Sequence, residues 1–248
     1  MNIKNIAFYA FFKPSFDLEC ARELLHHRMD ELKIKGTILL SPDEGINCSL
    51  SGVIEGMDTF LQFLFETISI KPPEIKISYS DNIPFKRSRV KVKSCIVPKP
   101  GSTPIDLTQD SAPYLSPEEF HQWIKNNKDM VILDTRNDFE FQVGRFKNAL
   151  HLGTKHFSNF EDDLQKAPQK WQNTPVVTFC TGGIRCEKAA PLMLKKGFQE
   201  VYQLDGGILN YFKTVGRGYF EGECFVFDER VALDEELTPP KHFCSNKE

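Results

Sequence analysis

Two hydrophobic periodicities alternate along the first 95 residues of the chain. Five short apolar runs have the length and composition of strands, and they are Ile6–Phe12, Gly36–Leu40, Ile46–Leu50, Ile75–Tyr79 and Arg89–Val97. Asp17–Leu32 and Met57–Ile68 instead carry apolar residues three and four positions apart, which is the spacing of a helix with one buried face. The resulting order of elements predicts a ferredoxin-like α+β domain over residues 1–97.

The pattern changes after residue 97. Five prolines lie between Pro98 and Pro117 with little periodicity, so we expect a linker over residues 98–115. The string Ser116-Pro117-Glu118-Glu119 then has the capping serine and first-turn proline that start a helix. Apolar strands such as Met130–Asp134 alternate with helices up to about residue 212. This alternation predicts an α/β domain with a central parallel sheet over residues 116–232, followed by a C-terminal tail over 233–248.

A cysteine follows one of these strands directly. The apolar run 174–179 ends at Cys180, the loop Thr181-Gly182-Gly183-Ile184 leads to Arg185, and a helix is expected from Cys186 to the glycine at 197. Unpaired N–H groups and the helix dipole favour an anion at such a position, and Arg185 adds a positive charge. Most cysteines are small core residues, but the glycine pair and the arginine favour a reactive thiol here. We therefore predict that Cys180 and Arg185 are catalytic and that residues 181–184 form the active-site loop.

Asp134 and Arg136 are expected at the same edge of the sheet, because Asp134 also ends a parallel strand. We expect them to support the site, with Asp134 accepting hydrogen bonds from loop amides and Arg136 holding the loop. A direct chemical role is the second interpretation. Two interpretations likewise stand for Cys186, a buried small residue or a resolving thiol, and for Glu44–Asn47, a tight turn or a substrate-facing hairpin.

Charge has to be examined locally, because the net charge of −3 over 248 residues gives no general nucleic-acid signature. Between Lys71 and Gly101 there are eight Lys or Arg and two Asp or Glu. In a strand, alternate side chains share a face, so four of these cations form one row, which we call the basic stripe: Arg87, Arg89, Lys91 and Lys93. The stripe is either a solvated, aggregation-resistant edge or an RNA-binding surface, and we favour RNA because like charges need a polyanion to compensate them.

The cysteines and the hydropathy point to a cytoplasmic protein. Seven scattered cysteines do not form a disulfide framework, and no secretory signal or membrane-length apolar run is present. No metal site is expected: the six histidines lack ligand spacing, and Cys244 has no neighbouring cysteine. No flavin, haem or iron signature is evident, so no bound cofactor is expected.

Several strings resemble a known family. Cys-x-x-Gly-x-Arg after a strand is similar to the active-site loop of the rhodanese superfamily, in which the cysteine carries a persulfide sulfur. The longer string Cys180–Ala189 resembles that of rhodanese-domain tRNA uridine hydroxylases. Four more strings resemble the same family, and they are Ser41–Gly52, Leu133–Glu140, Leu204–Tyr211 and Gly222–Arg230. The resemblance covers nearly the whole chain.

The resemblance implies an enzyme that hydroxylates C5 of the wobble uridine of tRNA, with molecular oxygen as co-substrate and the anticodon region of tRNA as partner. It also implies an acylphosphatase-like (ferredoxin-like) RNA-binding domain before the rhodanese-like domain. Cys180 could act as a thiolate that adds to C6 of uracil or as a persulfide that handles an oxygen equivalent. The alternative functions are a persulfide sulfurtransferase and a non-catalytic tRNA-binding or sulfide-sensing module. The oligomeric state stays open.

Overall fold

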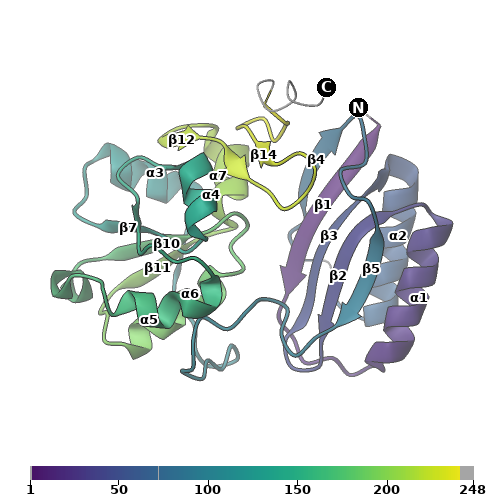
Figure 1. Ribbon diagram of the computed structural model, residues 1–248, viewed down its shortest axis with the longest axis horizontal. Coiled ribbons are helices and arrows are strands. Elements are labelled where there is room, and N and C mark those ends of the chain that lie inside the picture. The colour runs from purple at the N-terminus through teal and green to yellow at the C-terminus, as the bar shows by residue number, and fades with distance from the viewer. Residues whose placement is uncertain (1, 72, 241–248) are drawn as a thin grey trace. The chain divides into compact units, whose positions relative to one another are not determined.

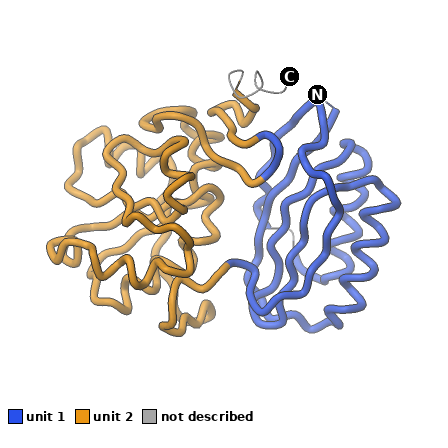
Figure 2. The backbone as a smooth tube through the Cα atoms, viewed as in Figure 1, with its two compact units in different colours: residues 1–97, 228–230 blue, residues 98–227, 231–248 orange. Residues whose placement is uncertain are grey.

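The computed structural model describes residues 2–71 and 73–240, which form two compact units (Figure 2). Unit 1 holds the residues up to 97 together with 228–230, and unit 2 holds 98–227 and the residues from 231 onward. The segment 228–230, which the sequence analysis placed in the second domain, is fixed to unit 1 by hydrogen bonds. Arg230 Nη1 donates to Ser78 Oγ at 2.7 Å, and the Glu229 amide donates to the Pro84 carbonyl at 3.0 Å.

Unit 1 has the expected ferredoxin-like fold with one added strand. Its elements are β1 (Ile3–Ala10), α1 (Leu18–Glu31), β2 (Lys35–Ser41), β3 (Gly45–Val53), α2 (Ile54–Ile68), β4 (Lys76–Ser80) and β5 (Ser88–Val92). The strand order is β4-β1-β3-β2-β5, in which the first four strands pair antiparallel and β5 pairs parallel to β2 at the edge. Both helices cover the same face of this sheet (Figure 1). The core lies between them.

The period-2 pattern of the strands creates that core. Ile38 and Leu40 of β2 and the alternate residues of β1 and β3 point toward the helices, where Leu25 of α1 and Phe60 of α2 are completely buried. Asp17 caps α1, because its side chain accepts a hydrogen bond from the Cys20 amide at 2.8 Å. The predicted elements of this unit are thus confirmed in order and type.

The end of β5 differs from the prediction, because the strand stops at Val92 rather than Val97. The chain leaves the sheet and is held at Ile96 by the turn between β2 and β3. Glu44 accepts a hydrogen bond from the Ile96 amide at 2.9 Å, and Asn47 Nδ2 donates to the Ile96 carbonyl at 3.0 Å. Of the two interpretations of Glu44–Asn47, the structure therefore supports a structural turn that fixes where unit 1 ends.

Unit 2 is built on a parallel sheet. Its strands are β6 (Tyr114–Leu115), β7 (Val131–Asp134), β8 (Gly144–Phe146), β9 (Leu150–His151), β10 (Val176–Phe179), β11 (Val201–Leu204), β12 (Phe220–Gly222), β13 (Cys224–Phe225) and β14 (Ala232–Leu233). Its helices are α3 (Pro117–Lys125), α4 (Asp138–Val143), η1 (Phe157–Asn159), α5 (Phe160–Leu164), η2 (Gln169–Asn173), α6 (Cys186–Lys195) and α7 (Gly207–Val215). The main sheet has the order β6-β11-β10-β7-β9, and every pairing in it is parallel. The predicted fold class is confirmed.

Helices cover both faces of this sheet (Figure 1). Val177 and Phe179 of β10 share a core cluster with Phe120 of α3 and Tyr211 of α7. The helix α6 packs on β10 and β11 from the opposite side. Because Phe179 pairs in register with Asp134, the segments that follow β7 and β10 leave the sheet at the same edge.

The expected linker contains structure that its prolines concealed. Within 98–115, strand β6 joins the main sheet, and the Asp205 amide donates to the Leu115 carbonyl at 3.0 Å. Further along, the Thr103 amide donates to the Glu161 carboxylate at 2.9 Å. The linker residues therefore pack on unit 2. The expected tail, 233–248, is described as far as residue 240, so Cys244 lies outside the described residues.

Candidate active site

The loop after β10 folds around the Cys180 thiol. Cys180 is 2% exposed, and its sulfur accepts a hydrogen bond from the Gly183 amide at 3.1 Å. Gly183 has a φ of 95°, a left-handed conformation that glycine adopts at little cost, and this turns its amide back toward the sulfur. Helix α6 begins directly after Arg185, so the thiol sits at the amino end of a ten-residue helix.

This environment favours the ionised form of Cys180. Burial by itself raises the pKa of a thiol, but here other contacts outweigh it. A hydrogen bond from the Cys186 thiol, the charge of Arg185 and the backbone amides of Arg185 and Gly183 lower the pKa of Cys180 to about 6. Burial instead raises the pKa of Cys48, Cys186 and Cys224. These contacts favour the thiolate form of Cys180, which is the form that the predicted reactivity requires.

The first turn of α7 supports the Cys180 loop. The Ile208 amide donates to the Cys180 carbonyl, and the Leu209 amide donates to the Thr181 carbonyl, each at 3.0 Å. Gly207 has a φ of +67°, and a Cβ at this position would lie 2.4 Å from the Cys180 carbonyl oxygen and 2.7 Å from the Gly183 nitrogen. Only glycine lets α7 approach the loop this closely. In the sequence these residues are visible only as part of a family resemblance, and nothing local in the string predicts their contact with the loop.

Arg185 forms an ion pair with Glu140. Its Nη1 lies 2.9 Å from Glu140 Oε2, and its Nη2 lies 3.2 Å from Glu140 Oε1. The Glu140 side chain is fully buried, and the Arg185 side chain is 13% exposed. Glu140 also accepts a hydrogen bond from the Asn137 amide at 3.1 Å, which fixes its carboxylate at the start of α4. Glu140 was missed as a site residue, since its partner is 45 positions away in the sequence.

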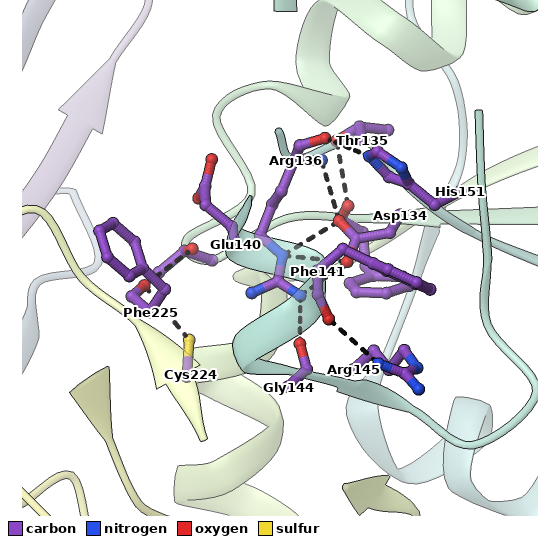
Figure 3. A network of polar contacts seen from close by, with 12 residues as sticks. Asp134, Thr135, Arg136, Glu140, Phe141, Gly144, Arg145, His151, Cys224 and Phe225 are labelled. Atoms are coloured by element: carbon purple, nitrogen blue, oxygen red, sulfur yellow. Dashed lines mark hydrogen bonds and ion pairs between the residues drawn. The ribbon is translucent and has the colours of Figure 1, made fainter. Parts of the chain in front are cut away.

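Asp134 and Arg136 bind each other rather than the loop (Figure 3). Asp134 Oδ2 lies 2.6 Å from Arg136 Nη2, and its Oδ1 accepts a hydrogen bond from the Arg136 amide at 2.9 Å. Arg136 Nη2 also donates to the Gly144 carbonyl at 2.6 Å. The expectation that Asp134 accepts hydrogen bonds from the loop amides is therefore wrong. The Asp134 carboxylate takes its hydrogen bonds from Arg136, only two residues away. Through the Gly144 carbonyl this buried pair also connects β7 with the segment after α4.

The four residues of the basic stripe are all exposed, and they lie on the edge strand β5 or directly beside it. Val90, between them in sequence, is 8% exposed and belongs to the core under the helices, so the cations point to the other face of the sheet. Lys35 precedes the β2 residue that pairs with Ser88, and it extends the row of positive charge on this face. Within residues 2–71 and 73–240, no acidic side chain forms an ion pair with any of the four.

Among the described residues, no group of three or more His, Cys, Asp or Glu is placed to hold a metal ion. In the same part of the chain, no helix is long and apolar enough to cross a membrane. What the geometry does show at the site is a buried thiol in a loop of backbone donors, beside a guanidinium that a carboxylate holds in place.

Comparison with known proteins covers both units. Residues 3–96 match the family described as UPF0176 acylphosphatase like domain, and residues 116–214 match the Rhodanese-like domain family. A tRNA uridine(34) hydroxylase of Legionella pneumophila (strain Paris) is 40% identical over 239 residues, which cover 95% of this chain and 93% of the relative. One of Bordetella avium is 42% identical over 244 residues, covering 96% of this chain and 100% of the relative. The chain belongs to the tRNA uridine(34) hydroxylase family.

A solved rhodanese-like domain from Anabaena sp. is also similar to part of this chain. It is 20% identical, covers 44% of this chain and 79% of that chain, and has a TM-score of 0.39. The relatives and the two family models confirm, at the level of the family, the resemblance seen in the separate sequence strings. The catalytic, supporting and RNA-binding roles of individual residues stay predictions.

Proposed function

We propose that this protein hydroxylates C5 of the uridine at position 34 of tRNA, the wobble position of the anticodon, with molecular oxygen as oxidant. The observation that carries the proposal is a low-pKa thiol in a donor-lined loop, in a chain that matches tRNA uridine(34) hydroxylases along nearly its whole length. One oxygen atom of O₂ enters the C–OH bond. The other leaves as water after accepting two electrons and two protons from a donor of the thiol class.

Cys180 supplies a nucleophile suited to uracil. A thiolate that adds to C6 forms an S–C6 bond and moves the electron pair of the C5=C6 double bond toward C5 and the O4 enolate. C5 then becomes the electron-rich carbon that an oxygen electrophile attacks. Loss of the C5 proton and of the sulfur restores the double bond and frees Cys180. Arg185 and the loop amides favour the thiolate that starts the reaction and receives the electron pair at its end.

The basic stripe provides the RNA contact in this proposal. Four exposed cations lie on or directly beside an edge strand, and no acidic side chain of residues 2–71 or 73–240 pairs with them, so they match the negative charge of a phosphate backbone. The anticodon arm is the part of tRNA that has to reach the enzyme, since position 34 lies in its loop. A cytoplasmic location follows from this substrate.

The test is nucleoside analysis of tRNA from a host strain that has no 5-hydroxyuridine. Expression of the wild-type chain should produce 5-hydroxyuridine, and mapping should place it at position 34. If the wild-type chain is folded and expressed but produces none, while it transfers sulfur from thiosulfate to cyanide, the sulfurtransferase alternative replaces this proposal.

The RNA contact is tested separately by replacing the four stripe residues with alanine. The slope of log binding constant against log salt concentration should fall by about 3–4, because each lost phosphate contact contributes about one. A control variant removes four exposed lysines elsewhere, Lys125, Lys147, Lys166 and Lys170, and so has the same change in charge. Equal weakening of tRNA binding in the two variants would show that net charge, not the stripe, sets the affinity.

A further inference from the structure

Three phenylalanine rings of unit 2 pack against one another beside the Cys180 loop. They belong to Phe139 of α4, Phe225 of β13 and Phe227 just after that strand, and we call them the aromatic cluster. The Phe225 ring centroid lies 5.0 Å from those of the other two rings, and the remaining pair is 6.2 Å apart. The interplanar angles are 87°, 86° and 89°, so all three contacts are edge to face. This packing fixes the orientation of each ring.

Much of the aromatic cluster faces solvent. Phe227 is 65% exposed and Phe139 is 46% exposed, although an aromatic side chain gains free energy from burial. Val226, between Phe225 and Phe227, is buried instead, because alternate residues of an extended segment point to opposite sides. The backbone thus directs Phe227 outward. An exposed apolar patch beside a candidate active site indicates a surface that another molecule covers.

Two contacts connect the aromatic cluster with the active-site loop. Thr181 Oγ1 donates to the Phe225 carbonyl at 3.4 Å. The guanidinium carbon of Arg185 lies over the Phe227 ring, 5.8 Å from its centroid. Thr181 and Arg185 stand at the two ends of the segment that follows Cys180, so the rings lie directly beside the loop that holds the thiol.

The burial of Cys180 sets a condition on an RNA substrate. Because the thiol is 2% exposed, a uridine has to leave the base stack of its RNA loop to reach it. The bases on either side of that uridine then lose a stacking partner. Aromatic side chains compensate such a loss in RNA-binding proteins, since every base has a π face, and a nearby arginine adds to the attraction.

We propose that the aromatic cluster, through its exposed ring Phe227, stacks against an unpaired base next to uridine 34 while that uridine enters the Cys180 loop. The inference deepens the proposed function and rests on it, because it takes an RNA loop as the substrate. Phe227 is a positioning residue in this proposal, since it holds the RNA and does not contact the reacting atoms.

The experiment measures binding of the purified full chain to synthetic anticodon stem–loops in the absence of oxygen. Wild type and Phe227→Ala are compared on the complete stem–loop and on two others, each with an abasic nucleotide on one side of uridine 34. Phe227→Ala should weaken binding of the complete stem–loop by about 5- to 100-fold, because a base–aromatic stack is lost. On one of the two abasic stem–loops the variants should agree within about twofold, since the ring has no base to stack on.

Three further variants separate stacking from other effects. Phe227→Trp keeps a flat ring and should retain the wild-type affinity. Phe227→Leu keeps an apolar side chain without a ring, so it should bind weakly, and it still fills the site if the alanine variant does not fold. Leu24→Ala is the matched control, because Leu24 is 48% exposed on α1 of unit 1, and it should bind all three stem–loops as wild type does.

Unchanged binding of the complete stem–loop by Phe227→Ala overturns the inference and leaves the aromatic cluster to a protein partner or a second copy of the chain. Equal weakening on all three stem–loops overturns it as well, and so does wild-type affinity of Phe227→Leu. The assay involves no chemical step, so it is separate from the hydroxylation. Absence of 5-hydroxyuridine with an intact dependence of Phe227 on the neighbouring base would reject the hydroxylase and leave the stacking contact in place.

Discussion

Replacing Gly207 with alanine should disable the Cys180 loop while leaving the rest of unit 2 folded. The new Cβ would lie 2.4 Å from the Cys180 carbonyl oxygen, where ordinary contacts exceed 3.4 Å, so one of the two segments has to move by about 1 Å. The left-handed φ of +67° costs an alanine about 1–2 kcal/mol, and the overpacking adds about 1–3 kcal/mol. We therefore expect a loss of about 2–5 kcal/mol in unfolding free energy.

Gly153→Ala is the matched control. Its φ is +73°, but nothing lies within 4 Å of the position that a Cβ would take. It should lose only the backbone term of about 1–2 kcal/mol. Urea unfolding measures both variants, and alkylation of Cys180 near pH 6.5 tests the loop itself. Gly207→Ala should lose the low-pH reactivity of Cys180, since the hydrogen bonds from Ile208 and Leu209 hold the loop in place, whereas Gly153→Ala should keep it. If both variants behave alike in the two assays, the close approach of α7 does not position the thiol.

Three further outcomes are expected. Alkylation of Cys180 should be half-maximal at about pH 6 and fall at lower pH as the thiolate is protonated. Cys48, Cys186 and Cys224, whose pKa values burial raises, should need higher pH, and peptide mapping by mass spectrometry that finds equal labelling of these thiols would contradict this. Glu140→Gln leaves Arg185 without its buried anionic partner and should lower the free energy of unfolding, measured with urea, by about 3–5 kcal/mol. The exposed control Glu118→Gln should lower it by less than about 1 kcal/mol. Asp134→Asn should destabilise unit 2 to a similar extent but keep the low-pH alkylation of Cys180, because Asp134 binds Arg136 and not the loop. Loss of that reactivity in folded protein would instead indicate that Asp134 supports the loop.

The parts of this protein that depend on local pattern were predictable from sequence. The ferredoxin-like order of unit 1 follows from alternating strands and two amphipathic helices, because such patterns record which face of each element is buried. The Cys180 loop was also predictable, since a thiol, a glycine pair and an arginine between a strand and a helix define an anion site within a few residues.

Contacts between distant segments could not be predicted in this way. Glu140 pairs with Arg185, which lies 45 positions further along the chain. Gly207 can approach the Cys180 loop only because it has no side chain. Strand β6 was hidden because two residues among prolines carry no periodicity, and only the neighbouring β11 makes them a strand. Asp134 was predicted at the correct edge of the sheet. Its carboxylate, however, accepts hydrogen bonds from Arg136, two residues away, instead of from the loop amides.

The most direct test of the account is the mass of the nucleoside at tRNA position 34 in cells grown under ¹⁸O₂. The host strain has no 5-hydroxyuridine of its own and expresses either the wild-type chain or Cys180→Ser, which retains the loop amides and Arg185 but lacks the thiolate. We predict 5-hydroxyuridine heavier by one ¹⁸O atom with the wild-type chain. With the serine variant we predict none, although the purified variant still binds tRNA. Wild-type levels of 5-hydroxyuridine from the serine variant, or an unlabelled hydroxyl group from the wild-type chain, would contradict the account.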